Sequence, residues 1–189
     1  MGQDENLEAS LAHIILCCVA GRGISRWSSR SFIHPGMHAN FFIHGLLGLI
    51  NFQSSAFGSD VSAAYKLSVK ATRYLALPCL MADMYRGPLT GNDSLVAIHL
   101  ASGLIPMLLA VSGKDNPHLG NLMVAANIIS LVHFSVQNSR DWGYYTALAG
   151  FLAYFGATNA GHPIFYPIAL AVMEYFAYRL YHYEPPPRR

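Results

Sequence analysis

Ionisable side chains occur in the middle of long apolar stretches of this chain. His44, His99 and His133 each lie among Ile, Leu, Val, Ala and Phe residues, and Glu174 is the only acidic residue at the middle of such a stretch. Imidazoles and carboxyls exchange protons, hydrogen-bond polar solutes and bind metals. In apolar surroundings these residue types indicate either a proton or solute path or hydrogen bonds that hold helices together.

The composition identifies the surroundings of these groups. The chain has 189 residues, of which 53% are hydrophobic and only 12% are charged, whereas a soluble domain has about 25% charged residues. The mean hydropathy is +0.30. Because the apolar residues are gathered into long runs with short polar breaks, the pattern predicts an all-α, polytopic transmembrane helical bundle. An unusually apolar soluble bundle is disfavoured, since several runs have no polar face.

Seven apolar segments can be delimited, and they predict six or seven membrane spans. A spanning helix needs about 20 residues, which the later segments provide more clearly than the first two. We expect residues 1–183 to form one transmembrane helical domain and 184–189 to form a mobile tail rich in Pro and Arg. The segments are 7–20, 37–52, 65–85, 94–111, 118–136, 142–158 and 163–183.

The third segment leaves the number of spans open. Lys66, Lys70 and Arg73 form one basic helical stripe, which suits a helix lying on a membrane surface. The segment is also long enough to span the bilayer with this stripe at the headgroups. Seven spans with the N-terminus outside and six spans with it inside both give eight basic residues inside against four outside. The positive-inside rule therefore does not separate them, although both place the C-terminus in the cytosol.

Helical periodicity places the polar residues of the second segment on one face. Asn40, His44 and Asn51 lie within about 40° of one another, with Gly48 between them, whereas His38 lies off this stripe. A polar line beside a glycine is typical of a helix face that packs against another helix. The asparagines Asn40, Asn51 and Asn127 are interpreted mainly as hydrogen-bonding groups between helices.

Three further segments carry a comparable face, and together the four faces predict a shared polar interior. Since His44 and Glu174 lie near the middle of their segments, we expect both near the midplane of the membrane. Glu174 is then expected to pair with His44, or with His99 or His133, because a lone charge at that depth is costly. The other faces consist of His99, Gly103 and Pro106; of Ala126, Ser130, His133 and Gln137; and of Pro167, Ala171, Glu174, Tyr178 and Tyr181.

Motifs of catalysis and cofactor binding are not found. The sequence has no phosphate loop, no nucleophile elbow and no zinc-protease motif, and it has no basic stripe with interleaved aromatics for nucleic acid. The three cysteines fit neither a zinc site nor a redox pair. No metal and no cofactor are predicted. Haem b between opposed histidines, His44 with His99 or His133, remains an alternative.

Three classes of function remain open. The short loops and missing catalytic motifs favour a non-enzymatic accessory, assembly or scaffold subunit that contacts the bilayer and another membrane protein or a second copy of itself. The second class is a small carrier or channel for protons or a polar solute, with Glu174 as titratable group and His44, His99 and His133 along its path. The third is an intramembrane enzyme or haem protein. The acidic N-terminus without a signal peptide fits an internal membrane of a eukaryotic cell.

Overall fold

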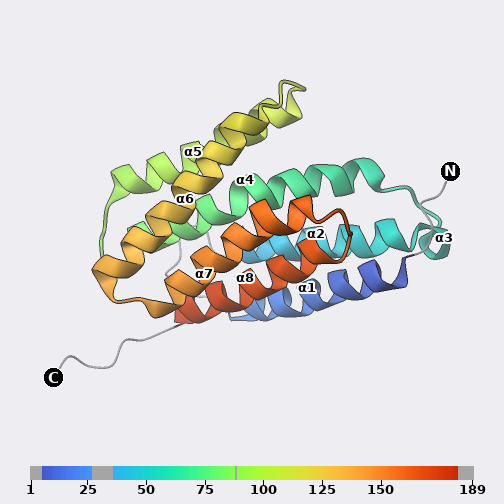
Figure 1. Ribbon diagram of the computed structural model, residues 1–189, viewed down its shortest axis with the longest axis horizontal. Helices are drawn as coiled ribbons and strands as arrows, with labels where there is room; N and C mark the ends of the chain where they lie inside the picture. Colours follow the sequence, from blue (N-terminus) through green and yellow to red (C-terminus); the bar gives the residue numbers. More distant parts are fainter. Residues whose placement is uncertain (1–5, 27–35, 88, 183–189) are drawn as a thin grey trace.

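A computed structural model describes residues 6–26, 36–87 and 89–182, and all regular structure in these ranges is helical (Figure 1). In these ranges eight helices follow one another, and the α5–α6 hairpin lies obliquely to the long axis along which α1, α2 and α4 run. The predicted tail, 184–189, lies outside the described residues. The all-α prediction is therefore confirmed for the described part of the chain.

The first two long helices, α1 (Leu7–Ser25) and α2 (Gly36–Phe52), form a closely packed pair. Asn6 caps α1 by accepting a hydrogen bond from the backbone N–H of Ala9 at 2.9 Å. The sequence predicts that this helix ends at Ala20, but it continues for five more residues. Glycine disfavours helix in isolated peptides, but the packing described below requires the small Gly23 in that last turn.

The short helix α3 (Ser54–Phe57) precedes α4 (Ser62–Arg86), which lies at the centre of the bundle and packs against α2, α5 and α6. Just before α4, the backbone N–H of Ser62 donates to the Asp60 carboxylate at 2.9 Å and lowers the pKa of that carboxyl. Pro78 lies inside α4 and is buried. The central position of α4 favours the interpretation of this segment as part of the bundle over a separate surface helix.

The helices α5 (Asp93–Val111) and α6 (Pro117–Asn138) form a hairpin beside α4. Each begins with an asparagine cap, Asn92 or Asn116, that accepts from a backbone N–H in the first turn. The chain returns through α7 (Asp141–Phe151), a π-helical turn (Leu152–Gly156) and a short 3₁₀ turn (Ala157–Asn159). It ends in α8 (Phe165–His182), which packs against α7, α1 and α2.

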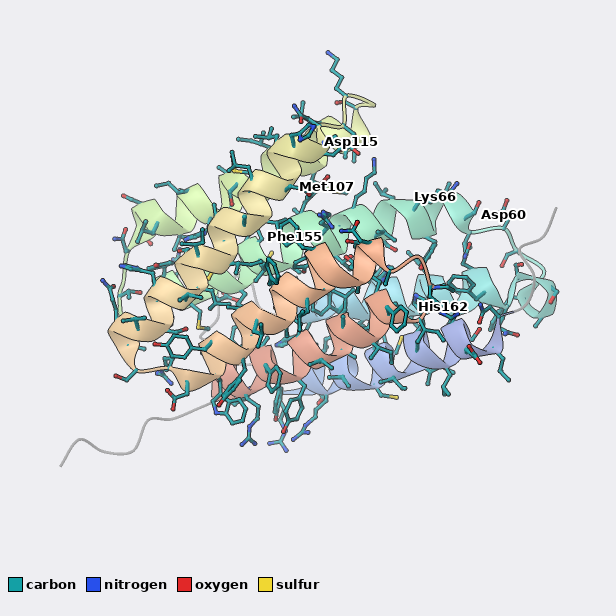
Figure 2. All side chains as sticks on the ribbon, viewed as in Figure 1. Asp60, Lys66, Met107, Asp115, Phe155 and His162 are labelled. Atoms are coloured by element: carbon teal, nitrogen blue, oxygen red, sulfur yellow. The ribbon has the colours of Figure 1, made fainter. Side chains whose placement is uncertain are left out.

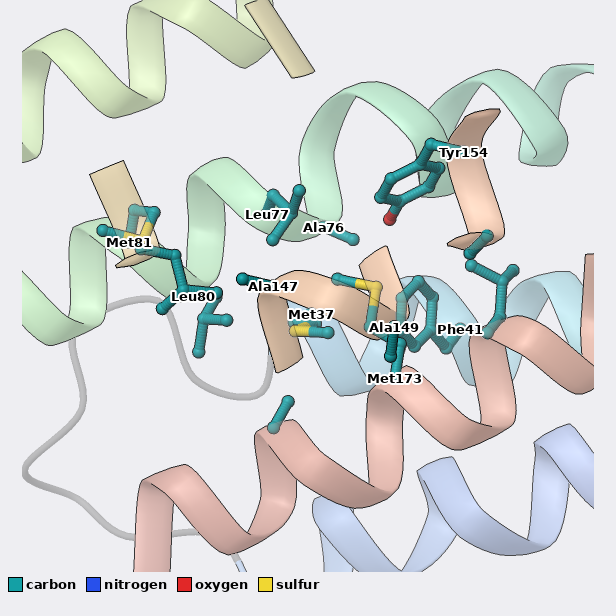
Figure 3. Packing of buried hydrophobic residues seen from close by; sticks show 14 of the residues in the cluster. Met37, Phe41, Ala76, Leu77, Leu80, Met81, Ala147, Ala149, Tyr154 and Met173 are labelled. Carbon is teal, nitrogen blue, oxygen red and sulfur yellow. The ribbon is translucent and has the colours of Figure 1, made fainter. Parts of the chain in front are cut away.

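The apolar core lies where α2, α4, α7 and α8 meet (Figure 3). Phe41 from α2, Leu77 from α4 and Met173 from α8 are fully buried there, and Tyr154 of the π-helical turn points into the same cluster. These side chains come from segments that are distant in sequence. They separate the polar groups of the interior into two layers.

All seven predicted segments correspond to long helices, but the prediction of six or seven spans is not supported at that level of detail. Among the described residues, only α1, α5 and α6 are both long and apolar enough to cross a membrane. Of the others, α2 has 17 residues and α7 has 11. Charged side chains gather toward the ends of helices, such as Asp115 at the α5–α6 turn and Lys66 near the start of α4 (Figure 2).

Candidate functional site

Helix α2 carries the candidate site because three other helices, α1, α4 and α8, pack around it. Glycines let α1 approach closely: a Cβ on Gly45 would lie 2.5 Å from Cys17 Sγ, and one on Gly48 would overlap the His13 ring. With partners on several sides, α2 buries more than one stripe. His38 and His44 are both fully buried although they point to different sides of the helix.

The first polar layer is a pair between His38 of α2 and Glu174 of α8. His38 Nδ1 is hydrogen-bonded to Glu174 Oε1, and both residues are 0% exposed. The pair fits because Gly23 of α1 has no side chain: a Cβ there would lie 2.5 Å from His38 Nδ1 and 2.7 Å from Glu174 Oε1. As an ion pair or as two neutral groups, the pair carries no net charge, which makes its burial tolerable.

Tyr181 extends this layer toward α4. Its ring packs against the His38 ring with centroids 5.1 Å apart, and its hydroxyl donates to Asp83 Oδ2 at 3.0 Å. Asp83 is buried in α4. The second oxygen of Glu174, Oε2, is buried and has no hydrogen-bond partner among the described residues. The layer thus holds two carboxyls, an imidazole and a phenol that can exchange or share protons.

The second polar layer surrounds His44 and includes His13 of α1. His44 Nδ1 lies 2.8 Å from Ser68 Oγ, and its ring stacks on Tyr65 with centroids 5.3 Å apart and an interplanar angle of 11°. The His13 and His44 ring centroids are 5.4 Å apart. His44 Nε2 is buried and has no hydrogen-bond partner among the described residues. An unpartnered nitrogen in this position distinguishes His44 from a purely structural histidine.

Tyrosines of α8 and of the π-helical turn join the second layer to α4. The Tyr166 ring meets the edge of His44 at 5.7 Å, and its hydroxyl lies 2.9 Å from Thr72 Oγ1. Because the Thr72 hydroxyl donates to Val69 O, it accepts from Tyr166. The Tyr154 hydroxyl donates to Thr72 O at 2.9 Å. These bonds hold α8 and the π-helical turn against α4 at the level of the apolar core.

A third polar group, around His99, is confined to α4, α5 and α6. His99 Nδ1–H donates to Asn127 Oδ1 at 2.7 Å, and His99 Nε2 accepts from the Ser130 hydroxyl at 3.1 Å. Tyr85 stacks on the ring at 5.2 Å, and its hydroxyl lies 3.3 Å from Ser130 Oγ. The Asn127 amide N–H donates to Ser102 Oγ at 2.8 Å. Both ring nitrogens are used, as expected of a group that joins helices.

The residues of the predicted interior cluster thus lie in separate polar groups and not in one. The structure brings His99 and Asn127 together, but it pairs Glu174 with His38 and not with His44, His99 or His133. Asn40 is half-buried and donates to Gly36 O within its own helix. His133 is exposed on α6. A functional role for these residues stays a prediction.

Two assumptions of the sequence reasoning explain the differences. The predicted depth of Glu174 assumed that all segments are centred on one plane, whereas Glu174 lies level with His38, about 9 Å along α2 from His44. In α6 only Ser130 of the expected inward stripe reaches the interior, whereas Ala126, His133 and Gln137 are exposed. The adjacent Asn127 is buried instead. Helix α6 packs through this other face against α4 and α7.

His13 and His38 are the residues that sequence reasoning did not include in the cluster. His38 was excluded because it lies off the polar stripe of α2, which is a valid criterion only for a helix with one buried face. His13 has a usable signal, since it lies in an apolar segment and Leu16 and Ala20 follow on its buried side. Its partners come from α2 and α4 and are not evident from sequence spacing.

Two of the three residues in the basic stripe of α4, Lys70 and Arg73, make contacts within the protein. Lys70 pairs with Asp115 of the α5–α6 turn at 2.7 Å. Arg73 donates to Tyr154 O at 2.7 Å and to Asn121 Oδ1 at 2.6 Å. Lys66 alone is exposed without a contact of this kind in the described part of the chain. The stripe therefore ties α4 to α6 and to the π-helical turn.

No group of three or more His, Cys, Asp or Glu residues in the described ranges is arranged to hold a metal ion. Cys17, Cys18 and Cys79 are free thiols.

Comparison with known proteins gives one match. Residues 37–164, more than half of the chain, match the model of a family described as a domain of unknown function, DUF4791. No curated protein and no solved structure matches the chain. The matched range contains α2 and α4 to α7, and so it includes His38, His44 and the His99 group but neither His13 nor Glu174.

Proposed function

This chain belongs to the DUF4791 family, and we propose that it is a multi-pass integral membrane protein with an accessory or scaffold role. The observation that carries the proposal is the apolar outer surface of the α5–α6 hairpin. Helix α5 has a mean hydropathy of 2.0 and only 22% of its most apolar stretch is buried, and Leu108, Leu122 and Ile129 are more than half exposed. Such a surface is costly in water and favourable in lipid.

We propose seven crossings, with α7 extended by the π-helical turn and the 3₁₀ turn that follow it. Helix α4, the least apolar of the long helices, lies at the centre of the bundle, where α2, α5 and α6 shield it from lipid. Arginines gather at one end of the bundle, in the last turns of α1, α4 and α8, while Lys66, Lys70 and Lys114 lie toward the other. The arginine end is proposed to face the cytosol. Helix α8 ends on that side, in agreement with the proposed cytosolic C-terminus.

Orientation can be measured with single cysteines labelled by a membrane-impermeant reagent on intact cells or sealed vesicles, in a background without the native cysteines. A cysteine at Lys114 is expected to react from the side opposite to one at Arg140. Labelling of both from the same side would exclude an odd number of crossings between them. The choice of a eukaryotic internal membrane remains a prediction.

The accessory role is supported by how the polar groups are used. Both ring nitrogens of His99 are hydrogen-bonded to neighbouring helices. Lys70 and Arg73 of the basic stripe bind groups within the protein. The outer apolar faces therefore remain for lipid and for a partner, another membrane protein or a second copy of the chain. Purification from native membranes in mild detergent, with mass spectrometry of the eluate, is expected to recover one stoichiometric partner. Elution of the chain as a monomer, without a partner, would contradict this role.

A second candidate, a proton or polar-solute carrier, is favoured by the fully buried pair of His38 and Glu174. Proton flux into vesicles that contain only the purified protein tests it, with a pH-sensitive dye inside. The carrier predicts that Glu174→Gln abolishes the flux and that the matched change His99→Gln does not. The enzyme or haem alternative gains no support from the geometry, because both nitrogens of His99 are hydrogen-bonded and His133 is exposed.

A further inference from the structure

The hydrogen bonds around His13 and His44 determine which ring nitrogen carries the proton. His13 Nδ1 lies 2.7 Å from Ala9 O, and since a carbonyl only accepts, Nδ1–H is the donor. The Ser68 hydroxyl donates its single hydrogen to Tyr65 O at 2.7 Å, so it accepts from His44 Nδ1–H. Both neutral imidazoles therefore present the lone pair of Nε2.

Neither Nε2 lone pair is strongly engaged. His44 Nε2 has no hydrogen-bond partner among the described residues, and the Tyr65 hydroxyl reaches His13 Nε2 only at 3.4 Å. Both histidines are 0% exposed. Histidines that bind a metal through one nitrogen usually donate the other N–H to a protein acceptor, which fixes the tautomer and the ring orientation. In both His13 and His44, Nδ1–H donates to a protein acceptor in this way.

We propose that His13 and His44 form a buried two-histidine site for one Cu(I) ion. With metal–nitrogen bonds of about 2 Å, the ring centres of two imidazoles on one ion lie about 5 Å apart at a tetrahedral angle and about 6.3 Å apart in linear coordination. The observed separation of the His13 and His44 centroids is 5.4 Å, with the rings inclined at 62°. Linear coordination of Cu(I) therefore requires the two rings to move apart by about 1 Å. Ion binding replaces the long contact between Tyr65 and His13 and needs no change of oxidation state.

The charge and number of ligands favour a monovalent ion over a divalent one. Zinc usually takes four protein ligands, or three and a water, and the described residues offer no group of three. The hydrogen-bond and ring contacts of the two histidines are with neutral groups, Ala9 O, Ser68, Tyr65, Phe52 and Tyr166. Copper is suited to imidazole ligands, and as Cu(I) it brings only a single charge into this interior.

The test is a titration of the full chain in detergent with Cu(I), without oxygen, against a colorimetric Cu(I) chelator. The wild type is expected to bind one tight equivalent with nitrogen ligands in the X-ray absorption spectrum. His13→Leu and His44→Leu each are expected to weaken it about 100-fold, and Ser68→Ala about tenfold through loss of ring orientation. His99→Leu is the matched control, because both of its nitrogens are already used, and it is expected to retain the wild-type affinity.

Three results would overturn the proposal. One is a wild type without a tight equivalent. Another is equal binding by wild type, His13→Leu and His44→Leu. The third is sulfur ligation with release of a proton on binding, since a thiol must ionise to bind and the two neutral imidazoles need not. The third result would assign the ion to Cys17, Cys18 or Cys79. Ser68→Ala keeps both ligands and so remains informative if a leucine variant does not fold.

Discussion

Two buried histidine groups differ in how completely their polar atoms are used. Around His99, each ring nitrogen has a partner, and the bonds run from Tyr85 through Ser130 and His99 to Asn127. Around His44 and His13, each Nδ1–H is anchored, but within the described ranges His44 Nε2 has no hydrogen-bond partner and His13 Nε2 has only a long contact. The first arrangement is what a structural group between helices needs. The second arrangement leaves two Nε2 lone pairs available as acceptors, and we interpret it as a metal-binding site.

The pair of His38 and Glu174 is the most demanding polar contact, and breaking it gives the largest expected effect. His38→Leu leaves the carboxyl of Glu174 buried without its partner and should lower the free energy of unfolding by about 3 to 5 kcal/mol. Denaturant titration in detergent micelles measures this. The double variant His38→Leu with Glu174→Leu should regain most of the loss. A loss in the double variant equal to the sum of the losses in His38→Leu and Glu174→Leu alone would show that the two groups do not interact.

Glycines of α1 provide a matched pair that tests the packing around this contact. Gly23→Ala places a Cβ against the His38 ring and the Glu174 carboxyl, and should cost about 1 to 3 kcal/mol. Gly21→Ala meets only the Phe42 ring at 3.5 Å, an ordinary contact. It should be neutral or stabilising by up to about 1 kcal/mol, because alanine favours helix. The unfolding temperatures of the two variants measure this difference in stability. Equal unfolding temperatures would contradict the close approach at Gly23.

Substitution in the closed His99 group should cost less stability than substitution in the His38–Glu174 pair and more than substitution of His44. Asn127→Leu removes the acceptor of His99 Nδ1–H and the hydrogen bond from the Asn127 amide to Ser102. The free energy of unfolding should therefore fall by about 1 to 2 kcal/mol. Unfolding of the variant in the same detergent measures the loss. A variant as stable as the wild type would mean that this network does not hold α5 and α6 together.

His44 gives the smallest expected effect. In the absence of metal, His44→Leu loses one hydrogen bond, to Ser68, and also removes an unpartnered buried nitrogen. The change in unfolding free energy should therefore be about 0.6 kcal/mol or less. Comparison with His99→Leu under identical conditions sharpens the distinction between the two histidines. If His44→Leu destabilised the protein more than His99→Leu, the interpretation of His44 as a site would lose its basis.

Much of the fold could be predicted from the sequence because runs of apolar residues and polar breaks are local features. The α5 stripe of His99, Gly103 and Pro106 is buried as predicted. On α8, Pro167, Ala171, Glu174 and Tyr178 are buried in the same way. In both helices one face is turned inward, which is the condition under which periodicity is informative.

The details of the interior could not be predicted for physical reasons. Helix α2 has three neighbours, so His38 is buried although it lies off the polar stripe. The end of α1 depends on Gly23, whose role becomes visible only when His38 and Glu174 are placed against it. On α6, the small and polar residues Ala126, His133 and Gln137 are exposed together with apolar ones, and the buried Asn127 lies beside them. Relative helix offsets and neighbours are tertiary properties that stripe patterns do not contain.

The central claim is that the outer faces of these helices lie in lipid, and α6 offers the most direct test. Ile129 is 69% exposed, whereas Asn127, two residues earlier, is 1% exposed. A spin label on Ile129→Cys, in a variant without the native cysteines and reconstituted in vesicles, reports collisions with molecular oxygen and with a water-soluble nickel chelate. We expect strong relaxation of the spin label by oxygen and little relaxation by the chelate. Strong relaxation by the chelate, as for a label in water, would contradict the claim.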